Sequence, residues 1–556
     1  MTVKEELEQL VRGALDKAQN EGRLPSVPAE ELTLERPQNP EHGDFACSLP
    51  LKLARSMRMS PMAISGELVS GIPLDLPLDR VWAAPPGFVN LSLTQSWLAE
   101  QVNTIRKAGA TYGNVEMGAG QRVQVEFVSI NPTGPLHVGH ARGAVIGSAL
   151  ANVLTAAGYD VVREYYFNDS GNQMDRVRQT LYARYAQLYG KPIELPPDGY
   201  VGQYMIDLAE EFKHSEGDRF LLLPEEQAIG ELGNLGIARI MEAIRADVQL
   251  LRIDFDVWFS ETSLFENGQF EKAMGLLRER DYVVERDGAV WFASTSLGEE
   301  QDKVLIRRTG DPTYFATDVA YHYNKFAERK FDRVINVLGA DHQGHVAQMK
   351  PLVGALGFSP EKLTMIVHQL VTLKRGDEVV RVSKRTGDIV TLRELVDEVG
   401  PDACRFVFLS RSPDSHMEFD LELAKQESSE NPVYYVQYAH ARIAGILGLG
   451  AEKSIDYEDG DISLLTHESE LALIRKMLVL PEIVEMMADR LEPHHLPHYA
   501  MELATAFQRF YEECRVVSGE PEDAPITKAR LKLVDSARIV LARCLGLMIM
   551  DAPETM

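Results

Sequence analysis

The hydrophobic pattern divides the chain into an α+β part, an α/β part and an all-α part. Residues 1–112 begin with an amphipathic helix and end in the strand-like alternation of Pro85–Leu93. Residues 113–370 alternate strand-like with helical segments, and residues 431–556 repeat apolar positions at helical spacing. Because regular strand–helix alternation is typical of a sheet covered by helices, we predict a central α/β domain with a further domain on each side.

Several segments of the central part have a specific expected structure. Val161–Phe167 and Arg333–Leu338 are candidate buried strands, and residues 168–256 are expected to form a helical insertion. An Asp-Gly pair in the middle of Val283–Phe292 predicts a β-hairpin. Residues 371–430 are expected to connect the α/β domain to the helical one.

The stretch Val123–Ala157 has the clearest chemical meaning. It reads as an alternating strand, a turn rich in Pro and Gly, and a helix that begins at His137-Val138-Gly139-His140. A helix start directs backbone N–H groups and the positive end of its dipole at an anion, so the pattern predicts a phosphate site. Gly139 would let a flat base or ribose approach the backbone. An ordinary strand–turn–helix with two surface histidines would show the same pattern.

A second phosphate-type segment lies at Arg381–Arg385, which is basic, contains a hydroxyl and is followed by Thr386-Gly387-Asp388. Together the two segments resemble the HIGH and KMSKS motifs of class I aminoacyl-tRNA synthetases. The first matches at three of four positions, and the second keeps Ser383 and Lys384. The resemblance implies a Rossmann-like catalytic domain that binds ATP at the carboxyl ends of its strands. The ATP-binding residues it implies are His137, Gly139, His140, Ser383 and Lys384, of which His137, His140 and Lys384 would be catalytic.

Longer segments narrow the family. VLIRRTGDPTYFATDVAYHYNKF, NVLGADHQGHVAQMK, FDVWFSETSLF and NPVYYVQYAHARI resemble arginyl-tRNA synthetases, and the resemblance covers nearly the whole chain. It implies that arginine is attached to tRNA(Arg) through an arginyl-adenylate. Mg²⁺ would accompany ATP without a dedicated metal site on the protein. The family also usually requires bound tRNA before the adenylate forms.

A pocket for arginine should offer carboxylates and a flat ring to the planar guanidinium. Glu126 on the first strand and the pair Tyr314 and Asp318, four residues apart on a helix, suit this need. Each carboxylate could instead be a solvated surface residue. The resemblance implies that these three hold the arginine side chain, that Asn131 and His140 hold its amino and carboxylate end, and that His342 lies nearby.

The resemblance also assigns the flanking domains. The N-terminal domain would contact the outer corner of the tRNA, and the helical domain would bind the anticodon. Aromatic side chains read unpaired bases by stacking, and the contacts expected here are Tyr438, Tyr511 and Met556. In one respect the chain departs from many relatives, which lack the second KMSKS lysine and carry a lysine at the position of Gly134. Lys384 is present here, so it is expected to supply the charge at the phosphates.

Composition sets further limits. A length of 556 residues with 45% hydrophobic and 25% charged residues is ordinary for a globular protein, and no apolar run is long enough to span a membrane. Four scattered cysteines argue against disulfides and structural zinc and favour the cytoplasm. The net charge of −26 argues against nucleic acid, although residues 374–385 hold five basic and two acidic residues. The family suggests a monomer.

Three other interpretations are open at this point. A class I synthetase for cysteine or glutamine would share both motifs, but a cysteinyl enzyme should show thiolate zinc ligands. A synthetase-like RNA-binding protein without activity should have lost some of the motif residues. A small nucleotidyltransferase with a similar HIGH loop would leave the C-terminal helical region without a role.

Overall fold

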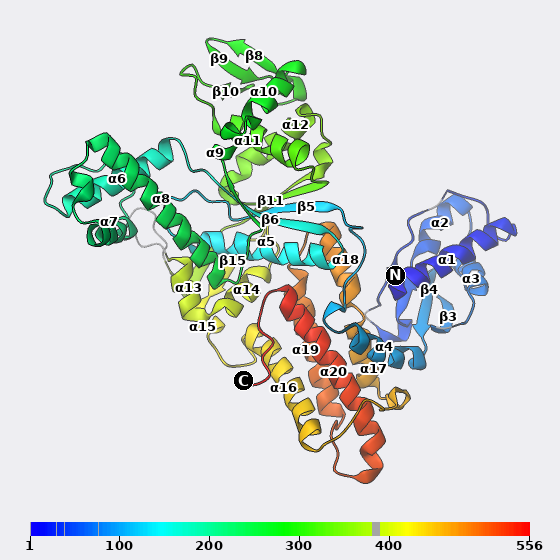
Figure 1. Cartoon of the computed structure of the whole chain (residues 1–556). Coiled ribbons are helices and arrows are strands. Elements are labelled where there is room, and N and C mark those ends of the chain that lie inside the picture. Colours follow the sequence, from blue (N-terminus) through cyan, green and yellow to red (C-terminus); the bar gives the residue numbers. More distant parts are fainter. Residues whose placement is uncertain (1, 29, 38, 76, 381–389) are drawn as a thin grey trace.

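The computed structural model describes residues 2–28, 30–37, 39–75, 77–380 and 390–556 (Figure 1). The N-terminal domain contains an antiparallel sheet in the order β1–β2–β4–β3. Its strands are β1 (Leu34–Glu35), β2 (Phe45–Cys47), β3 (Leu78–Ala84) and β4 (Phe88–Leu93). Helices α1 (Val3–Asn20), α2 (Leu49–Met57) and α3 (Pro61–Gly71) pack around the sheet, and α4 (Gln95–Ala108) leads out of the domain.

A parallel sheet in the order β12–β11–β5–β6–β7 forms the centre of the α/β region. The strands are β5 (Arg122–Glu126), β6 (Asp160–Phe167), β7 (Val257–Ser260), β11 (Arg333–Gly339) and β12 (Leu363–His368). The expected strands near residues 161–167 and 333–338 are therefore present. Because β5 lies between β11 and β6, Glu126 belongs to a central strand and is buried, so its interpretation as a surface residue is wrong.

Helices cover the sheet and extend from it. Helix α5 (Val138–Ala156) is almost entirely buried, since its many small residues allow close packing. The insertion between β6 and β7 consists of the helices α6 (Asn172–Gln187), α7 (Gln203–Glu216) and α8 (Glu225–Leu250). Between β7 and β12 lie α9 (Thr262–Glu266), α10 (Gln269–Glu279), α11 (Tyr314–Tyr323) and α12 (Gln343–Ala355).

Two small sheets flank the parallel one. The expected hairpin is formed by β8 (Val283–Arg286) and β9 (Ala289–Phe292), and β10 (Lys303–Ile306) extends it. The connecting region contributes β13 (Val371–Arg375), β14 (Glu378–Val379) and β15 (Met417–Asp420). It also holds α13 (Leu392–Val399), α14 (Pro401–Leu409) and α15 (Leu421–Ala424).

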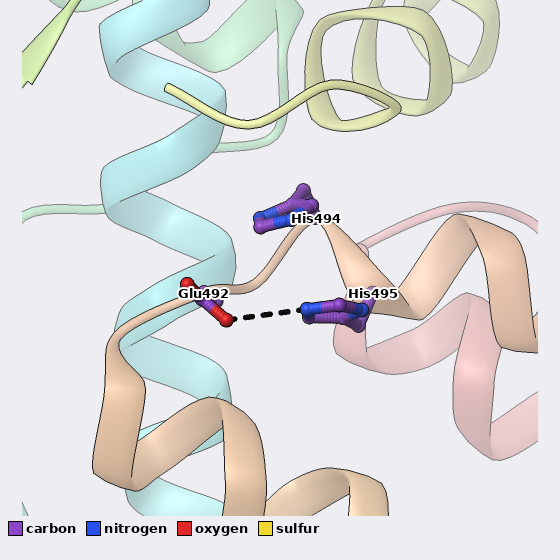
Figure 2. A group of neighbouring side chains, drawn as sticks. All are labelled: Glu492, His494 and His495. Carbon is purple, nitrogen blue, oxygen red and sulfur yellow. Dashed lines mark hydrogen bonds and ion pairs between the residues drawn. The ribbon is translucent and has the colours of Figure 1, made fainter. Parts of the chain in front are cut away.

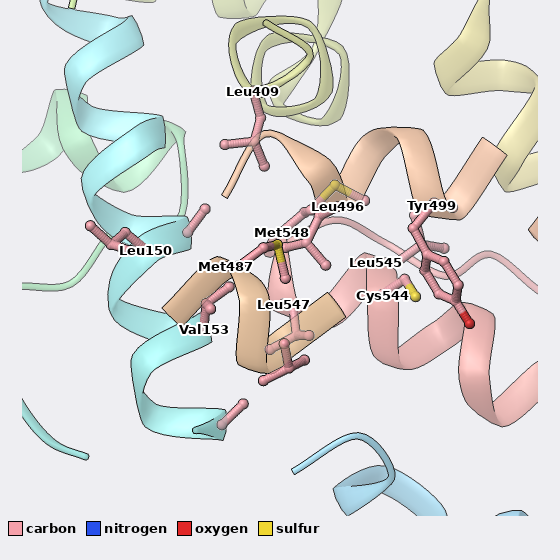
Figure 3. Close-up of a cluster of buried hydrophobic side chains, with 14 of the residues drawn as sticks. Leu150, Val153, Leu409, Met487, Leu496, Tyr499, Cys544, Leu545, Leu547 and Met548 are labelled. Carbon is pink, nitrogen blue, oxygen red and sulfur yellow. The ribbon is translucent and has the colours of Figure 1, made fainter. Parts of the chain in front are cut away.

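The C-terminal domain is a helix bundle of α16 (Pro432–Glu452), α17 (Glu468–Met477), α18 (Leu480–Arg490), α19 (His495–Glu513) and α20 (Ala524–Leu547). Its core is continuous with that of the α/β region. Figure 3 shows Leu150 of α5 and Leu409 of α14 beside bundle side chains such as Met487 and Leu496. The two regions thus share one hydrophobic core, which predicts that they unfold together.

Ion pairs are among the contacts between the N-terminal domain and the bundle. Arg36 binds Glu482 at 2.7 Å, and the buried carboxylate of Asp44 accepts from Arg475 at 2.6 Å. In Figure 1 this domain lies to one side of the bundle, next to α17 and α18. Within the part of the chain described here, no helix is both long and apolar enough to cross a membrane.

Candidate active site

The chain makes a strained turn between β5 and α5. Val128 has φ 69° and Ser129 has φ 42°, although a β-branched residue such as Val rarely adopts a positive φ. The Ser129 hydroxyl accepts from the Tyr166 N–H at 3.1 Å and so fastens the turn to β6. Strain of about 1–3 kcal/mol per residue is typical of functional sites. Here it accompanies the segment that leads to the histidine pair.

The two histidines begin α5, as the sequence predicts. His137 is the N-cap, and its Nδ1 accepts from the Gly139 N–H at 3.1 Å. Nδ1 of His140 accepts from the His137 N–H at 3.3 Å, and the ring centroids are 3.5 Å apart. Since both Nδ1 atoms accept, the neutral rings carry their proton on Nε2. A Cβ at position 139 would lie 2.9 Å from His137 Cε1, which explains the glycine.

The proposed Ser383 and Lys384 lie outside the described residues. The described residues that follow them are fixed to the histidine segment by backbone hydrogen bonds. Val138 N–H donates to Val390 O at 3.3 Å, and Leu392 N–H donates to Leu136 O at 2.8 Å. Val390 and Leu392 therefore lie directly beside the start of α5.

Glu126 lies deep in the site and has a cationic partner that the sequence did not reveal. Its Oε2 accepts from Lys325 Nζ at 2.5 Å, and both side chains are buried. Lys325 also donates to Asn336 Oδ1 at 3.1 Å and lies 4.0 Å from the centroid of the Tyr321 ring. Lys325 follows α11 in a π-helical segment, Asn324–Glu328. Such segments are frequent at functional sites, and this one holds Lys325 against β5 and β11.

Asp318 is half-buried on α11 among other carboxylates. Its pKa is raised to about 7, first because the protein shields it from water and then because Glu126 and Glu261 repel its charge. Lys325 acts in the opposite direction. Glu261 accepts from Asn168 Nδ2 at 3.0 Å and from the Tyr166 hydroxyl, so it is already engaged. Asp318 and Glu126 thus lie close enough for their charges to interact, and Lys325 offsets part of that repulsion.

Tyr314 begins α11, and its side chain is 53% exposed. Tyr200 of the insertion lies close enough to Tyr314 that the two hydroxyls influence each other electrostatically. The Tyr204 hydroxyl donates to Thr133 O at 2.5 Å, in the turn before α5. The insertion therefore contributes aromatic side chains beside the predicted arginine pocket.

Asn131 and His342 occupy the same end of the sheet. Asn131 Nδ2 donates to Gln173 Oε1 at 2.7 Å, and its Oδ1 accepts from the Asn168 N–H at 3.2 Å. His342 is exposed and lies just beyond the carboxyl end of β11, with Nε2 3.8 Å from Asp341 Oδ2. Because the carboxyl ends of parallel strands share one edge, the sheet gathers both residues around the start of α5.

Two of the expected anticodon residues, Tyr438 and Tyr511, lie beside Arg442 in the bundle and are exposed. Arg442 donates to the Tyr438 hydroxyl at 2.9 Å, and its guanidinium lies 4.7 Å from the Tyr438 ring and 5.2 Å from the Tyr511 ring. Tyr438 is 38% exposed and Tyr511 is 42% exposed. Met556 ends the tail, which is held to α16 where His440 Nδ1 bonds Pro553 O at 2.8 Å.

Sequence reasoning missed a row of buried polar residues across the sheet. Asn336, Glu126 and Glu164 occupy adjacent register positions on β11, β5 and β6. Glu164 is fully buried and accepts from the Tyr321 hydroxyl at 2.5 Å and from Arg329. A glutamate in the strand Val161–Phe167 was the available signal, because an ionised side chain in a buried parallel strand needs a partner.

Three family models and a set of curated relatives match this chain. Residues 101–428 match the family model "tRNA synthetases class I (R), catalytic domain", residues 436–556 match "DALR anticodon binding domain", and residues 5–93 match "Arginyl tRNA synthetase N terminal domain". An arginine–tRNA ligase of Dehalococcoides mccartyi (strain CBDB1) is 55% identical to this chain, and the match covers 98% of this chain and 97% of the length of the relative.

Solved structures point to the same family. A putative arginyl-tRNA synthetase from Campylobacter jejuni shares 31% identity with a TM-score of 0.76, over 84% of this chain and 100% of its own. The Thermus thermophilus arginyl-tRNA synthetase has the same fold over 100% of both chains, with 24% identity and a TM-score of 0.79. The motifs, the architecture and these relatives lead to one conclusion: the chain belongs to the arginyl-tRNA synthetases, a class I family.

Proposed function

We propose that this protein activates L-arginine with ATP and transfers it to tRNA(Arg), releasing pyrophosphate and then AMP. The observation that carries the proposal is the pair of carboxylates Glu126 and Asp318 on the same α/β domain as the histidine-capped start of α5. One feature suits the guanidinium of arginine and the other suits phosphate, at the same edge of the sheet. The full-length relatives with this activity support the assignment.

Arginine would enter with its guanidinium directed at Asp318. A carboxylate accepts two parallel N–H bonds from the guanidinium fork, and Tyr314 would cover the flat face of that group. Glu126, which is paired with Lys325, would add a second negative charge that attracts the guanidinium. Asn131 would bind the α-amino end, with His342 beside the same substrate. Lysine would be rejected without editing, because its ammonium leaves acceptors of the pocket poorly paired.

ATP would lie over the start of α5. The Nε2–H groups of His137 and His140 would donate to phosphate oxygens, Gly139 would admit the adenosine, and Ser383 and Lys384 would approach from the basic segment. A carboxylate oxygen of arginine then attacks the α-phosphorus, forming the mixed anhydride of arginyl-adenylate as the bond to pyrophosphate breaks. The residues mainly position groups and stabilise charge. Mg²⁺ would arrive with the ATP phosphates as part of the substrate complex.

In the second step a terminal ribose hydroxyl of tRNA(Arg) attacks the adenylate carbonyl. The hydroxyl loses its proton, the ester bond forms, and the bond between the carbonyl carbon and AMP breaks, so that AMP leaves. The bundle would hold the anticodon through Tyr438, Tyr511 and Met556, and the N-terminal domain would contact the outer corner of the tRNA. Because unpaired bases are recognised by stacking, the exposed rings beside Arg442 support this role.

A charging assay tests the proposal. Purified protein, ATP, Mg²⁺ and labelled arginine are mixed with a tRNA(Arg) transcript, and acid-stable label on the RNA is measured. We expect charging with arginine and none with lysine. As a matched control, a tRNA(Lys) transcript should remain uncharged with either amino acid. Charging with lysine, or none from a folded sample, would contradict the proposal.

A further inference from the structure

A cluster of metal-ligand side chains lies outside the active site, in the connection between α18 and α19. The sequence there is Glu492-Pro493-His494-His495-Leu496-Pro497-His498. Glu492, His494 and His495 each offer one ligand atom, and these three atoms lie within 4.8 Å of one another. Figure 2 shows both imidazole rings with nitrogens turned to the side where the Glu492 carboxylate lies.

The distances within the cluster suit a small divalent ion. Glu492 Oε2 is 3.2 Å from His495 Nε2, and the two imidazole centroids are 4.3 Å apart. Ligand atoms about 2.0–2.2 Å from a tetrahedral Zn²⁺ are themselves roughly 3.3–3.5 Å apart. A small rotation of the His494 side chain would bring its nitrogen to the same distance and complete the three ligands. All three residues are half-buried, so an ion and its remaining water ligands could reach them from solvent.

The backbone of the connection is well constrained. Leu491 ends α18 with φ 58°, and the Glu492 N–H donates to Met487 O at 3.2 Å. The prolines on either side of the histidine pair further restrict the chain. A ligand set on a constrained turn loses little conformational entropy on binding an ion. The helical end of α18 also directs its carbonyl dipole towards this turn, which favours a cation.

One side chain of the cluster is incompletely satisfied. Nδ1 of His494 is buried and has no hydrogen-bond partner among the described residues. The positive start of α19 opposes a cation, but Glu492 and the nearby Asp414 both act on His494 as negative charges.

We propose that Glu492, His494 and His495 form a binding site for a divalent transition metal of the Zn²⁺ class. Two imidazoles and one carboxylate select borderline ions such as Zn²⁺ and Co²⁺ over Mg²⁺ or Ca²⁺. The ion would fasten the start of α19 to the end of α18. The sequence expectation was that the chain holds no metal, because the cysteines form no zinc pattern; this site uses none of them.

The site lies where the bundle meets the catalytic region. Asp414 belongs to the loop between α14 and β15, in which Ser412 O and Ser415 O accept from the buried Arg142 of α5, both at 2.8 Å. A metal at the turn would therefore stiffen a contact between α19 and the loop that holds the active-site helix. Its role would be structural and separate from the chemistry of arginine activation.

Metal titration of the full-length protein tests the proposal. Co²⁺ is used as a spectroscopic probe, and Zn²⁺ binding is measured by calorimetry with Mg²⁺ as a hard-ion control. We expect saturable binding of one Zn²⁺ and no Mg²⁺ binding at the same site. Each of Glu492→Gln, His494→Gln and His495→Gln should weaken Zn²⁺ binding at least about tenfold, since even outer partners of metal ligands contribute 10–100-fold.

The exposed His214 of α7 provides the matched control. His214→Gln should leave Zn²⁺ affinity unchanged, and Zn²⁺ should raise the melting temperature of the wild type but not of His495→Gln. Far-UV circular dichroism establishes that each variant is folded. The proposal is overturned if no saturable binding occurs, if His214→Gln weakens binding as much as the cluster variants do, or if folded cluster variants bind as tightly as the wild type.

Discussion

At the scale of single residues, the proposed arginine site brings several carboxylates together. Glu126 is buried and Asp318 is half-buried, and burial together with the charge of Glu126 raises the pKa of Asp318. Lys325 offsets part of this repulsion, and the guanidinium of the substrate would offset the rest. The sequence predicted both carboxylates but not Lys325, because a lysine in a helical segment normally reads as a solvated side chain.

The raised pKa of Asp318 predicts a pH dependence for arginine use. With a pKa of about 7, Asp318 of the ligand-free protein is protonated below that pH and loses its charge for the guanidinium. We expect kcat/KM for arginine to fall about tenfold per pH unit below 7 and to level off above it. Asp318→Asn should lower kcat/KM for arginine about 10- to 150-fold and leave KM for ATP unchanged. It should also abolish the change of kcat/KM near pH 7. A step near pH 7 that persists in the variant would exclude Asp318 as its source.

The same carboxylate should also weaken the fold. Its folded pKa lies above its ordinary value near 3.8, so the folded state holds the proton more tightly than the unfolded one. Stability is then lost as pH rises from about 4 to about 7 and is constant above. Urea unfolding should therefore find Asp318→Asn more stable than the wild type at pH 8, with the difference closing towards pH 4. A variant that is less stable at pH 8 would contradict this account.

Lys325 should affect both stability and the pocket. Lys325→Met leaves Glu126 buried without its cation, which should lower the free energy of unfolding by about 3–5 kcal/mol. It should also move the pH step of kcat/KM for arginine above 7, because Lys325 now lowers the pKa of Asp318. Lys350→Met removes an exposed pair with Glu361 at 3.5 Å and should change stability by less than about 0.5 kcal/mol. Equal effects of the two substitutions would argue against a special role for Lys325.

At the scale of elements, α5 and α11 organise the site. The sequence predicted where α5 begins, since the turn, the histidines and the run of small residues all agree. It also predicted the strands β6 and β11 and the β8–β9 hairpin. It did not predict the π-helical segment after α11, because its extra residue per turn depends on the pairing of Lys325 with Glu126 and Asn336 in three dimensions.

The start of α5 provides an element-scale prediction. In Gly139→Ala the new Cβ would lie 2.9 Å from His137 Cε1 and 3.0 Å from Nδ1, so the imidazole must leave its capping position. We expect adenylate formation to fall about 10²-fold, the scale of a 1 Å displacement of a positioning group. Gly13→Ala on α1 is the control, because its new Cβ would meet nothing within 4 Å. Gly147→Ala is unsuitable, because its Cβ would clash with the Phe127 side chain. An unimpaired Gly139→Ala enzyme would mean that the cap geometry is not needed.

At the scale of the whole molecule, one cluster of buried apolar side chains includes α5, the bundle and the N-terminal domain, and ion pairs add to the contacts between that domain and the bundle. The sequence indicated three regions in the correct order, because hydrophobic periodicity is a local property. Contacts between α5, α18 and α20 depend on residues far apart in the chain, so periodicity could not supply them. The net charge of −26 is likewise a property of the whole chain and does not describe the local surfaces that a tRNA would meet.

The anticodon proposal is tested at this scale. Tyr511→Ala removes one exposed ring beside Arg442 and should raise KM for tRNA(Arg) about 5- to 150-fold, the range for loss of one base–aromatic stack. KM for arginine at saturating tRNA should be unchanged. The buried neighbour Phe507 serves as contrast, since Phe507→Ala should destabilise the fold by about 3–5 kcal/mol. Comparable destabilisation by Tyr511→Ala would make Tyr511 a core residue.

The central claim is that this pocket activates arginine, and pyrophosphate exchange into ATP tests it most directly. The exchange is measured with each of the twenty amino acids, with and without total tRNA. The account predicts exchange with arginine and with none of the other nineteen amino acids. Because the family usually requires bound tRNA, the exchange is expected only when tRNA is present. Exchange with another amino acid, or no exchange from a demonstrably folded protein in any condition, would contradict the account.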